Sequence, residues 1–459
     1  MRAFSAAEVL RLLPSRPRVL ALGEPTHGED LLLEVRNELF QQLVEEGYRT
    51  IAIESDCLLA LAVDDYVTSG KGSLDEVMAN GFSHGLGASA ANRELVRWMR
   101  AYNDGRPAPE QVRFAGIDGP LEISGPESPQ EALTTLYAYL ASRLDAELLP
   151  CPAGTIEGLL DDAGRWVDPA VMMNPARSVG QSAAAGRLRL LADDLVALLD
   201  AETPHLIAAS SREEWERARL YGRAAVGLLR YHHWLADTSP GRMTRLLGVR
   251  DSMMADNLVA LAGRGPVLVH AHNLHLKREK AVMGMWQGRM EWWGAGSLAH
   301  ARLGTEYAFL ATALGTIRHQ GVDTPPTDTL EGMLYALPED RFLVDSHALA
   351  ALFGDAAPRR ASRPGSATPH WIRPTCPGPT ASCSSRTRRR GRRRKSWWSR
   401  GGASGRRGPG GGVRRCDPSP LSANRHPFLT YGDRNLSFRE WIPTSSPPNR
   451  TWPAWSPRR

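Results

Sequence analysis

Short apolar runs, separated by polar and amphipathic segments, organise the chain as far as residue 344. Apolar runs of four to six residues bounded by turn-forming residues are typical of strands covered on both faces. The four clearest runs lie at residues 19–22, 50–53, 112–117 and 266–269, and two more lie at 307–311 and 341–344. The pattern predicts a sheet of buried strands.

Between the first two runs the apolar positions change to the spacing of a helix. They are Leu32, Val35, Leu39 and Leu43. Thr26 and Glu29 fit a capping box, with threonine as the N-cap and glutamate at the third helical position, and Gly47 marks the end. The segment predicts a strand–helix–strand unit with parallel strands, and it places His27 in the first helical turn.

A long segment rich in Ala, Leu, Arg and Glu separates the third and fourth runs. Helices are predicted at residues 186–202, 213–237 and 243–263, because apolar residues recur there at helical spacing. The expected fold is α/β, an open and mostly parallel sheet flanked by helices, with a large helical portion (about 130–263) roofing the cleft. The Met- and Trp-rich residues 283–293 fit a mobile lid or a partly buried loop equally well.

Acidic and histidine side chains follow the ends of four predicted strands. Because the carboxyl ends of parallel strands line one edge of a sheet, where ligands bind, we expect these side chains in one crevice. They are Glu24, His27, Glu54, Asp118, His272 and His275. Any one of them alone is compatible with an ordinary polar residue in a loop, but four strand ends with the same property favour a site for acid–base chemistry.

Two effects oppose each other at His27. A helix N-terminus disfavours the charged imidazolium and keeps a neutral ring available as a base, whereas Glu24 favours the charged form. The sequence does not decide between them, and a capped helix start carrying an exposed histidine is the plainer interpretation.

Two other kinds of site are compatible with the sequence. Residues 81–85 match the Gly-X-Ser-X-Gly pattern of a nucleophile elbow, but the preceding residues 74–78 do not resemble the strand that such an elbow needs. A metal site is the second: His270, His272 and His275 are closely spaced, and with Glu24 and Asp118 they could bind zinc or iron. No pair of cysteines with ligand spacing supports a metal site.

Charge divides the chain into two parts. Residues 361–459 contain 21 Lys and Arg but 3 Asp and Glu, whereas residues 1–360 contain 35 and 47. We expect one α/β domain over 1–360 and a basic, Arg/Gly/Pro/Ser-rich and disordered tail over 361–459, because the tail has too few aliphatic residues for a core. This composition also fits an out-of-frame reading of a G+C-rich gene, and our hypothesis is a frameshift near residue 373.

The remaining composition favours a cytoplasmic protein. No apolar run is long enough to span a membrane, the N-terminus lacks a signal pattern, and the first 360 residues hold two cysteines, Cys57 and Cys151. We expect no membrane partner. The basic tail could bind nucleic acid, but its composition is explained more simply by the frameshift. The oligomeric state is not predicted.

The motif at residues 23–28, Gly-Glu-Pro-Thr-His-Gly, resembles the Gly-Glu-Ala-Thr-His-Gly signature of the erythromycin esterase family. Further matching segments follow in the family's order between about residues 20 and 345. They are Arg36, 52–54, 98–103, 116–118, 250–251, 254–255 and 272–275. The chain departs from the family at Pro25 and at residues 269–270, neither of which removes a candidate catalytic group.

The resemblance implies hydrolysis of a macrolide lactone or similar ester by water, without a covalent intermediate or cofactor. It implies that His27 is the general base and Glu24 orients it. Further catalytic groups are Glu54, His272, His275, Arg36 and Arg250, and the substrate-binding candidates are Asp118, Trp98 and Asn273. Arg36 fits poorly, since an ideal helix that starts at Thr26 puts it on the face opposite His27.

Three alternatives stay open from the sequence. One is a metal-dependent hydrolase or a metal- or haem-binding protein of the same fold, because relatives in the wider superfamily are thought to bind iron or haem. The second is a catalytically silent relative in a biosynthetic operon. The third is a protein that binds nucleic acid through its tail.

Overall fold

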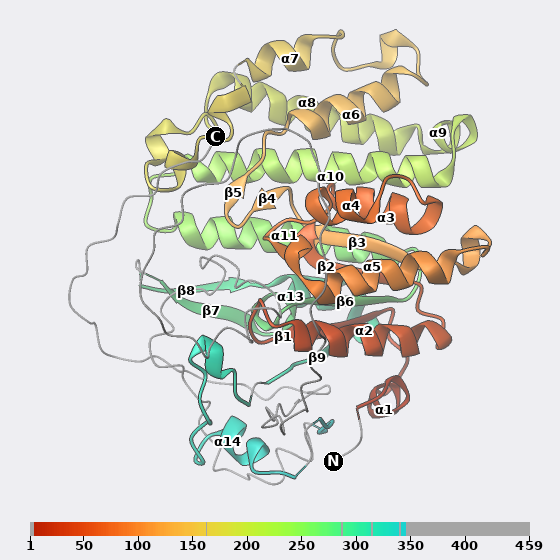
Figure 1. Cartoon of the computed structure of the whole chain (residues 1–459). Helices are drawn as coiled ribbons and strands as arrows, with labels where there is room; N and C mark the ends of the chain where they lie inside the picture. Colours follow the sequence, from red (N-terminus) through yellow and green to blue (C-terminus); the bar gives the residue numbers. More distant parts are fainter. Residues whose placement is uncertain (1–3, 162, 286–287, 314, 339–340, 346–459) are drawn as a thin grey trace, which may run out of the picture.

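The computed structural model describes residues 4–345 except 162, 286–287, 314 and 339–340. Its centre is a five-stranded sheet in which all the strand pairs are parallel, with the order β3-β2-β6-β1-β9 (Figure 1). The strands are β1 (Val19–Glu24), β2 (Thr50–Asp56), β3 (Arg113–Asp118), β6 (Val267–His272) and β9 (Tyr307–Leu310). The predicted fold class is confirmed, and five of the six predicted strands form this sheet.

The prediction of a sixth strand, at residues 341–344, is wrong. Leu343 takes part in an isolated bridge, and the segment is otherwise irregular. Phe342, Leu343 and Val344 are nevertheless buried. A short apolar run signals burial, and burial can be achieved without strand pairing.

β6 lies between β1 and β2, so the predicted strand–helix–strand unit is parallel but its two strands are not neighbours. In register, Glu24 at the end of β1 faces His272 at the end of β6. Asp56 at the end of β2 faces Asp118 at the end of β3. The sheet therefore delivers acidic and histidine residues from four strands to one edge.

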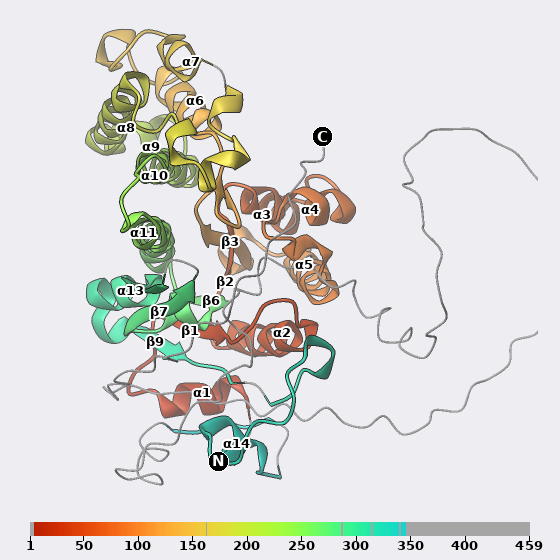
Figure 2. The ribbon, with the colours of Figure 1, turned by 90° about the vertical axis from the view of Figure 1, so that its left-hand side faces the viewer.

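Helices cover both faces of the sheet (Figure 2). One face carries α1 (Ala6–Leu12), α2 (Asp30–Glu45), α3 (Ala60–Ser69), α4 (Leu74–Asn80) and α5 (Ala90–Asn103), and the other carries α11 (Arg242–Ala262) and α13 (Ala295–Leu303). Side chains alternate along each strand, as the pleat requires. In β1, Leu20 and Leu22 pack against the helices of the first face, whereas Val19 and Ala21 pack against those of the second face.

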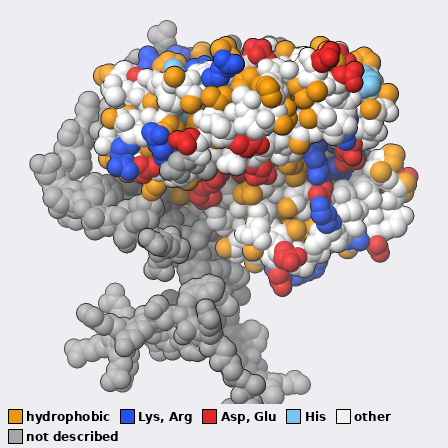
Figure 3. Space-filling model, turned by 90° about the horizontal axis from the view of Figure 1, so that it is seen from above, with side chains coloured by type: hydrophobic (Ala, Val, Ile, Leu, Met, Phe, Trp, Pro, Cys, Tyr) orange, Lys and Arg blue, Asp and Glu red, His pale blue; other side chains and the backbone are white. Residues whose placement is uncertain are grey.

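A separate helical layer lies beyond the β3 edge (Figure 1). It contains α6 (Gln130–Ala141), α7 (Thr155–Leu160), α8 (Ala183–Ala201), α9 (Thr203–Ala209) and α10 (Arg212–Leu235), which share a hydrophobic core of their own. The three predicted helices correspond to α8, α10 and α11. Figure 3 shows that the outer face of this layer mixes apolar with acidic and basic side chains. None of the helices that the structure describes is both long and apolar enough to span a bilayer.

Shorter elements complete the described chain. Two further strands, β7 (Lys280–Met285) and β8 (Gly288–Trp293), pair in antiparallel fashion as a hairpin. α12 (Asn273–Leu276) directly follows β6, β4 (Leu121–Glu122) pairs with β5 (Gly125–Pro126), and α14 (Leu330–Tyr335) lies near the end. The tail at 361–459, with its predicted disorder and frameshift, lies outside the described residues.

Candidate active site at the carboxyl edge of the sheet

The turn after β1 differs from the predicted capping box. α2 begins at Asp30, its N-cap is Glu29, and no side chain caps it. Thr26 is buried instead, and its hydroxyl has no hydrogen-bond partner among the described residues. His27 therefore lies in an irregular turn before the helix. Gly28 has a φ of 83°, a conformation that favours glycine, and it lets the chain reverse after His27.

A close approach between β1 and α12 fixes the floor of this edge. A Cβ at Gly23 would lie 2.0 Å from Oδ1 of Asn273, so a side chain cannot be placed there. The Asn273 amide donates to the carbonyl of Thr312 at 2.9 Å, and the Thr312 hydroxyl donates to the carbonyl of Gly23 at 2.6 Å. Asn273, a predicted substrate-binding residue, is thus engaged in holding the chain together.

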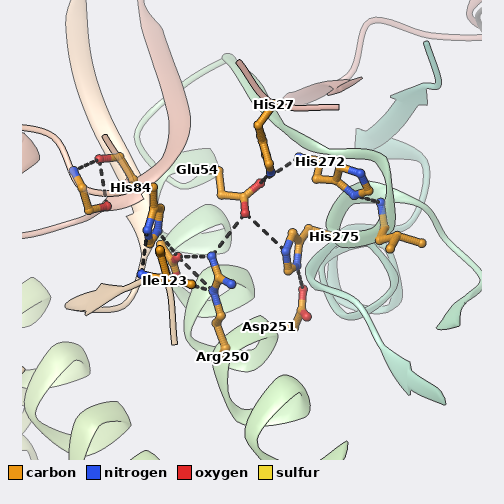
Figure 4. Close-up of polar contacts among 12 residues, drawn as sticks. His27, Glu54, His84, Ile123, Arg250, Asp251, His272 and His275 are labelled. Atoms are coloured by element: carbon orange, nitrogen blue, oxygen red, sulfur yellow. Dashed lines mark hydrogen bonds and ion pairs between the residues drawn. The ribbon is translucent and has the colours of Figure 1, made fainter. Parts of the chain in front are cut away.

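Glu54, at the end of β2, lies at the centre of the site (Figure 4). Its Oε1 lies 3.2 Å from Nη2 of Arg250 and 3.3 Å from Nε2 of His275. Its Oε2 accepts a hydrogen bond from the backbone of His272 at 2.8 Å and lies 3.8 Å from Nε2 of His27. Burial opposes ionisation of Glu54, but His275, His27 and Arg250 outweigh it and hold its pKa well below the usual range. Glu54 is a buried, permanently charged carboxylate.

His27 is held from the other side by Glu24. Nδ1 of His27 lies 2.9 Å from Oε2 of Glu24, so Nδ1 is the natural position for the ring proton and Nε2 points toward Glu54. The His27 side chain is 24% exposed, whereas those of Glu24 and Glu54 are 5% and 8% exposed. Burial lowers the pKa of His27, but Glu24 and Glu54 outweigh it and raise the pKa to about 9. Of the two opposing influences on this ring, the carboxylates prevail.

His275 lies between two carboxylates. Its Nδ1 is 2.8 Å from Oδ1 of Asp251 on α11, and its Nε2 is 3.3 Å from Oε1 of Glu54. Burial lowers the pKa of His275, but Asp251 and Glu54 more than compensate and raise it to about 10. At neutral pH His275 is therefore an imidazolium that donates to both carboxylates.

The two histidines of β6, His270 and His272, have lowered pKa values. Burial and the nearby His27 lower the pKa of His272 to about 3, and burial and Arg36 lower that of His270 well below its usual range. Nδ1 of His272 accepts from the backbone of Leu274 at 3.2 Å, which places its ring proton on Nε2. The rings of His27 and His272 are 5.4 Å apart. The site thus combines two histidines that favour the charged form with two that stay neutral.

Arg250 and Asp118 form a buried pair behind Glu54. Nε and Nη2 of Arg250 lie 3.0 Å and 2.6 Å from Oδ2 of Asp118, which is completely buried. His84 donates to the same oxygen through Nε2 at 2.9 Å, because its Nδ1 accepts from the backbone of Ile123. Asp118, predicted to bind substrate, is bonded to Arg250 and His84 in this structure.

His84 and Asp251 are two residues of this network that the sequence analysis did not select. His84 belongs to the segment that was considered as a nucleophile elbow, and Asp251 stands next to Arg250 in a segment that matches the family. The position of His84 next to Ser83 in the elbow-like motif was the feature of the sequence that could have indicated a functional role for it. Nothing in the spacing of α11 indicated that the Asp251 carboxylate would reach α12.

The nucleophile elbow is not formed. α4, not a strand, precedes it, as expected. Ser83 is 2% exposed, and its hydroxyl lies 3.3 Å from that of Ser55 and accepts from the backbone of Asp56 at 2.8 Å. Among the described residues, the hydrogen-bond partners of Ser83 are thus structural and include no histidine.

The residues proposed for a metal site do not fit one. Among the residues that the structure describes, no group of three or more histidine, cysteine or acidic side chains is arranged to hold a metal ion. Both ring nitrogens of His275 are engaged by carboxylates, and His270 is 4% exposed on the sheet face that α2 covers.

Arg36 and Trp98 are not joined to the cluster by direct bonds. Arg36 is 1% exposed, and its guanidinium donates to the side chains of Asn37 and Asn92. Burial lowers its pKa to about 10, although Glu24 and Asp30 oppose this. The late start of α2 brings it close enough to influence Glu24 and His270. Trp98 on α5 packs against the buried Phe40 of α2 and against Tyr102 of its own helix.

Comparison with known proteins places this geometry in a family. The family model described as erythromycin esterase matches residues 43–371. The chain belongs to the erythromycin esterase family. A search of curated proteins found no match.

Solved structures resemble the fold of this erythromycin esterase family member. A protein from Bacillus cereus is 19% identical with a TM-score of 0.55, and 72% of this chain covers 77% of it. The erythromycin esterase EreC, as a histidine-to-asparagine mutant in its open conformation, is 17% identical with a TM-score of 0.51, and 72% of this chain covers 82% of it. These likenesses show the α/β fold. Membership of the erythromycin esterase family suggests a hydrolase.

Proposed function

We propose that the protein hydrolyses a lactone or similar ester with water activated by His27, and that macrolide lactones are the first substrate class to test. The observation that carries this proposal is the state of His27. Its side chain is 24% exposed, more than those of Glu24, Glu54 and His275, and a buried carboxylate holds its Nδ1, so that Nε2 is left for a water molecule. This arrangement is typical of a general base.

The proposed reaction uses one water molecule. Neutral His27 removes a proton from water through Nε2 while the water oxygen attacks the ester carbonyl carbon, and Glu24 stabilises the imidazolium that forms. The tetrahedral oxyanion collapses, the acyl carbon–oxygen bond breaks, and the imidazolium returns the proton to the leaving alkoxide. The products are an acid and an alcohol, or a hydroxy acid if the ester is a lactone.

The other charged residues have supporting roles in this proposal. Arg250 and His275 hold Glu54 ionised and add positive charge near the developing oxyanion. Arg36 adds positive charge from beneath, through its influence on Glu24. We assign the remaining four residues to shaping the site, because the contacts described above for each are made within the protein. They are His272, Asn273, Asp118 and Trp98.

The raised pKa of His27 shapes the proposed activity. With a pKa of about 9, the ring is mostly protonated at neutral pH, so the reactive form is a minority that grows as the pH rises. The remaining neutral ring is a stronger base than an ordinary histidine. We therefore expect kcat/KM to increase from neutral pH toward pH 9.

The experiment incubates the full chain with a panel of macrolides, other lactones and simple esters, and follows the mass of each product. A substrate of the proposed class gains the mass of one water, and the intact mass of the enzyme shows no acyl adduct during turnover. An acyl adduct would contradict direct attack by water. No turnover with any member of the panel would contradict the proposal and favour a catalytically silent relative. Turnover that EDTA removes and added metal restores would favour the metal-dependent alternative.

A further inference from the structure

The carboxylate of Asp251 joins three elements of the chain behind the candidate active site. Asp251 is on α11 and is completely buried. Its Oδ1 lies 2.8 Å from Nδ1 of His275 on α12 and accepts the backbone N–H of Ala295, at the start of α13, at 2.8 Å. Its Oδ2 accepts the indole N–H of Trp292, on β8, at 2.6 Å. Figure 4 shows Asp251 beneath His275, on the side away from His27.

Trp292 ties the β7–β8 hairpin to this carboxylate. Its side chain is buried, and the residue pairs with Ala281 across the hairpin. Met290, two residues earlier on the same strand face, packs with apolar residues of α10 and α11. The next residue, Trp293, points the other way, is 52% exposed and has the Lys280 ammonium over its ring. Two adjacent tryptophans on one strand therefore differ in their relation to the site.

We propose that Trp292 and Asp251 are positioning residues, through which the β7–β8 hairpin holds the His275 ring with its Nε2 directed at Glu54. Neither residue is assigned a contact with substrate. The indole N–H and the Ala295 N–H each engage one oxygen of the carboxylate, so the carboxylate cannot rotate without losing a buried hydrogen bond. Its orientation in turn fixes the tautomer and direction of the ring.

The charged and titratable groups around His275 come from several elements. Asp251 and Arg250 lie on α11, Glu54 on β2, His27 in the turn after β1, and His272 at the end of β6. Asp251 and Glu54 are the anions that bond directly to the ring. Removing the Asp251 charge therefore leaves one anion where there were two, whereas removing the indole N–H leaves every charge in place and frees the carboxylate to move.

The test is nuclear magnetic resonance of the full protein without substrate. In the wild type, the His275 Nδ1 proton should give a strongly downfield signal that exchanges slowly with solvent, because it is bonded to a buried carboxylate. Trp292→Phe preserves a buried aromatic ring and removes the N–H. It should make exchange of this proton about ten- to a hundredfold faster, in keeping with the loss of a hydrogen bond to a charged acceptor. Trp293→Phe on the same strand is the matched control and should leave exchange within about twofold of the wild type.

A second variant guards against misfolding of Trp292→Phe. Asp251→Asn keeps the size of the side chain and removes its charge. It should abolish the downfield signal and lower the pKa of His275, assigned with a His275→Gln variant, from about 10 toward the ordinary value of 6.5. Unchanged exchange in a folded Trp292→Phe protein, or an unchanged His275 pKa in Asp251→Asn, would overturn the proposal.

The consequence for turnover rests on the proposed function and is measured separately. Trp292→Phe should lower kcat by about tenfold while KM changes by less than about twofold, since the substrate does not contact the indole. A change in KM alone would contradict a positioning role. If no ester is hydrolysed at all, the resonance measurements still decide whether the hairpin holds His275, so the two proposals fail independently.

Discussion

An ion network lies at each end of strand β3, and the two networks differ in composition. At its start, Arg113 donates to Asp64 on α3 at 3.0 Å through Nε and to Glu213 on α10 at 2.5 Å through Nη2. At its end, Asp118 pairs with Arg250, which continues to Glu54 and His275. Both networks join the sheet to the helical layer or to α11, and both contain a carboxylate that is at most 8% exposed.

The difference lies in the groups that can change charge near neutral pH. The first network consists of arginine and carboxylates, and burial of Arg113 is outweighed by Asp64, so its pKa rises further from neutral. The second network includes His27, raised to about 9, and His272, lowered to about 3. Both networks therefore contain a buried carboxylate. Of the two, only the network at the candidate site contains histidines whose pKa values are displaced.

The largest expected effect comes from His27→Ala. Loss of a general base should reduce kcat/KM for any true substrate by at least about 10²-fold. His233→Ala, which changes a partly buried histidine on α10, is the control and should retain activity close to that of the wild type. A His27→Ala protein as active as the control would remove His27 from the mechanism.

Breaking the ion network at the start of β3 should lower the stability of the protein. Asp64→Asn leaves Arg113 without its principal partner, and breaking such a pair should lower the free energy of unfolding by about 2–3 kcal/mol, below the value for a fully buried pair because Arg113 is 23% exposed. Urea unfolding measures the loss. kcat/KM of the folded variant should remain unchanged, and a selective loss of kcat/KM without destabilisation would show that the two networks are not separate.

Glu24→Gln should move the pH profile of the site. The change removes the carboxylate nearest His27, so the pKa of the ring falls below about 9 and the ascending limb of kcat/KM moves to lower pH. The maximum rate should also fall, because the imidazolium formed in the reaction loses its stabilising partner. If the ascending limb of the pH profile does not move in Glu24→Gln, the group that titrates along it is not His27.

The smallest expected effect is on the pH dependence of stability. The folded pKa of His27 is above its unfolded value of 6.5, so its contribution is fully present below pH 6.5 and is lost as the pH rises through about 9. Unfolding of the wild type and His27→Gln, compared between pH 6 and pH 9.5, should show a larger fall in stability for the wild type. Parallel curves would mean that the ring is not held in its charged form.

The sequence predicted those parts of the molecule that depend on regular periodicity. The buried strands and the long helices α8, α10 and α11 follow from runs and spacings, and the gathering of Glu24, Glu54, Asp118 and His272 follows from parallel strand direction. The start of α2 was wrong, because Thr26 fits a capping pattern yet is buried. The sequence pattern of a helix cap does not show whether the capping residue will be buried in the fold.

Contacts between distant elements were beyond the sequence. Asp251 meets His275 because α13 packs against both α11 and α12, and the resulting pKa values depend on which carboxylates are nearest. The domain limits and the frameshift near residue 373 remain predictions, and the family match ends at residue 371. Translating the gene in its other two frames tests the frameshift, and it would be wrong if neither frame continues with a strand-forming sequence.

The position of β6 has a consequence for biosynthesis. β1 and β2 are made early, but the strand that separates them in the sheet is made about two hundred residues later, after the whole helical layer. A ribosome-bound chain that has not reached residue 272 therefore has two strands with no partner between them, whose open edges are prone to mispairing. Insertion of β6 closes that gap and delivers His272 and the α12 residue His275 to the same edge, so one late step joins the two halves of the sheet and assembles the candidate site, before β9 is added at the edge.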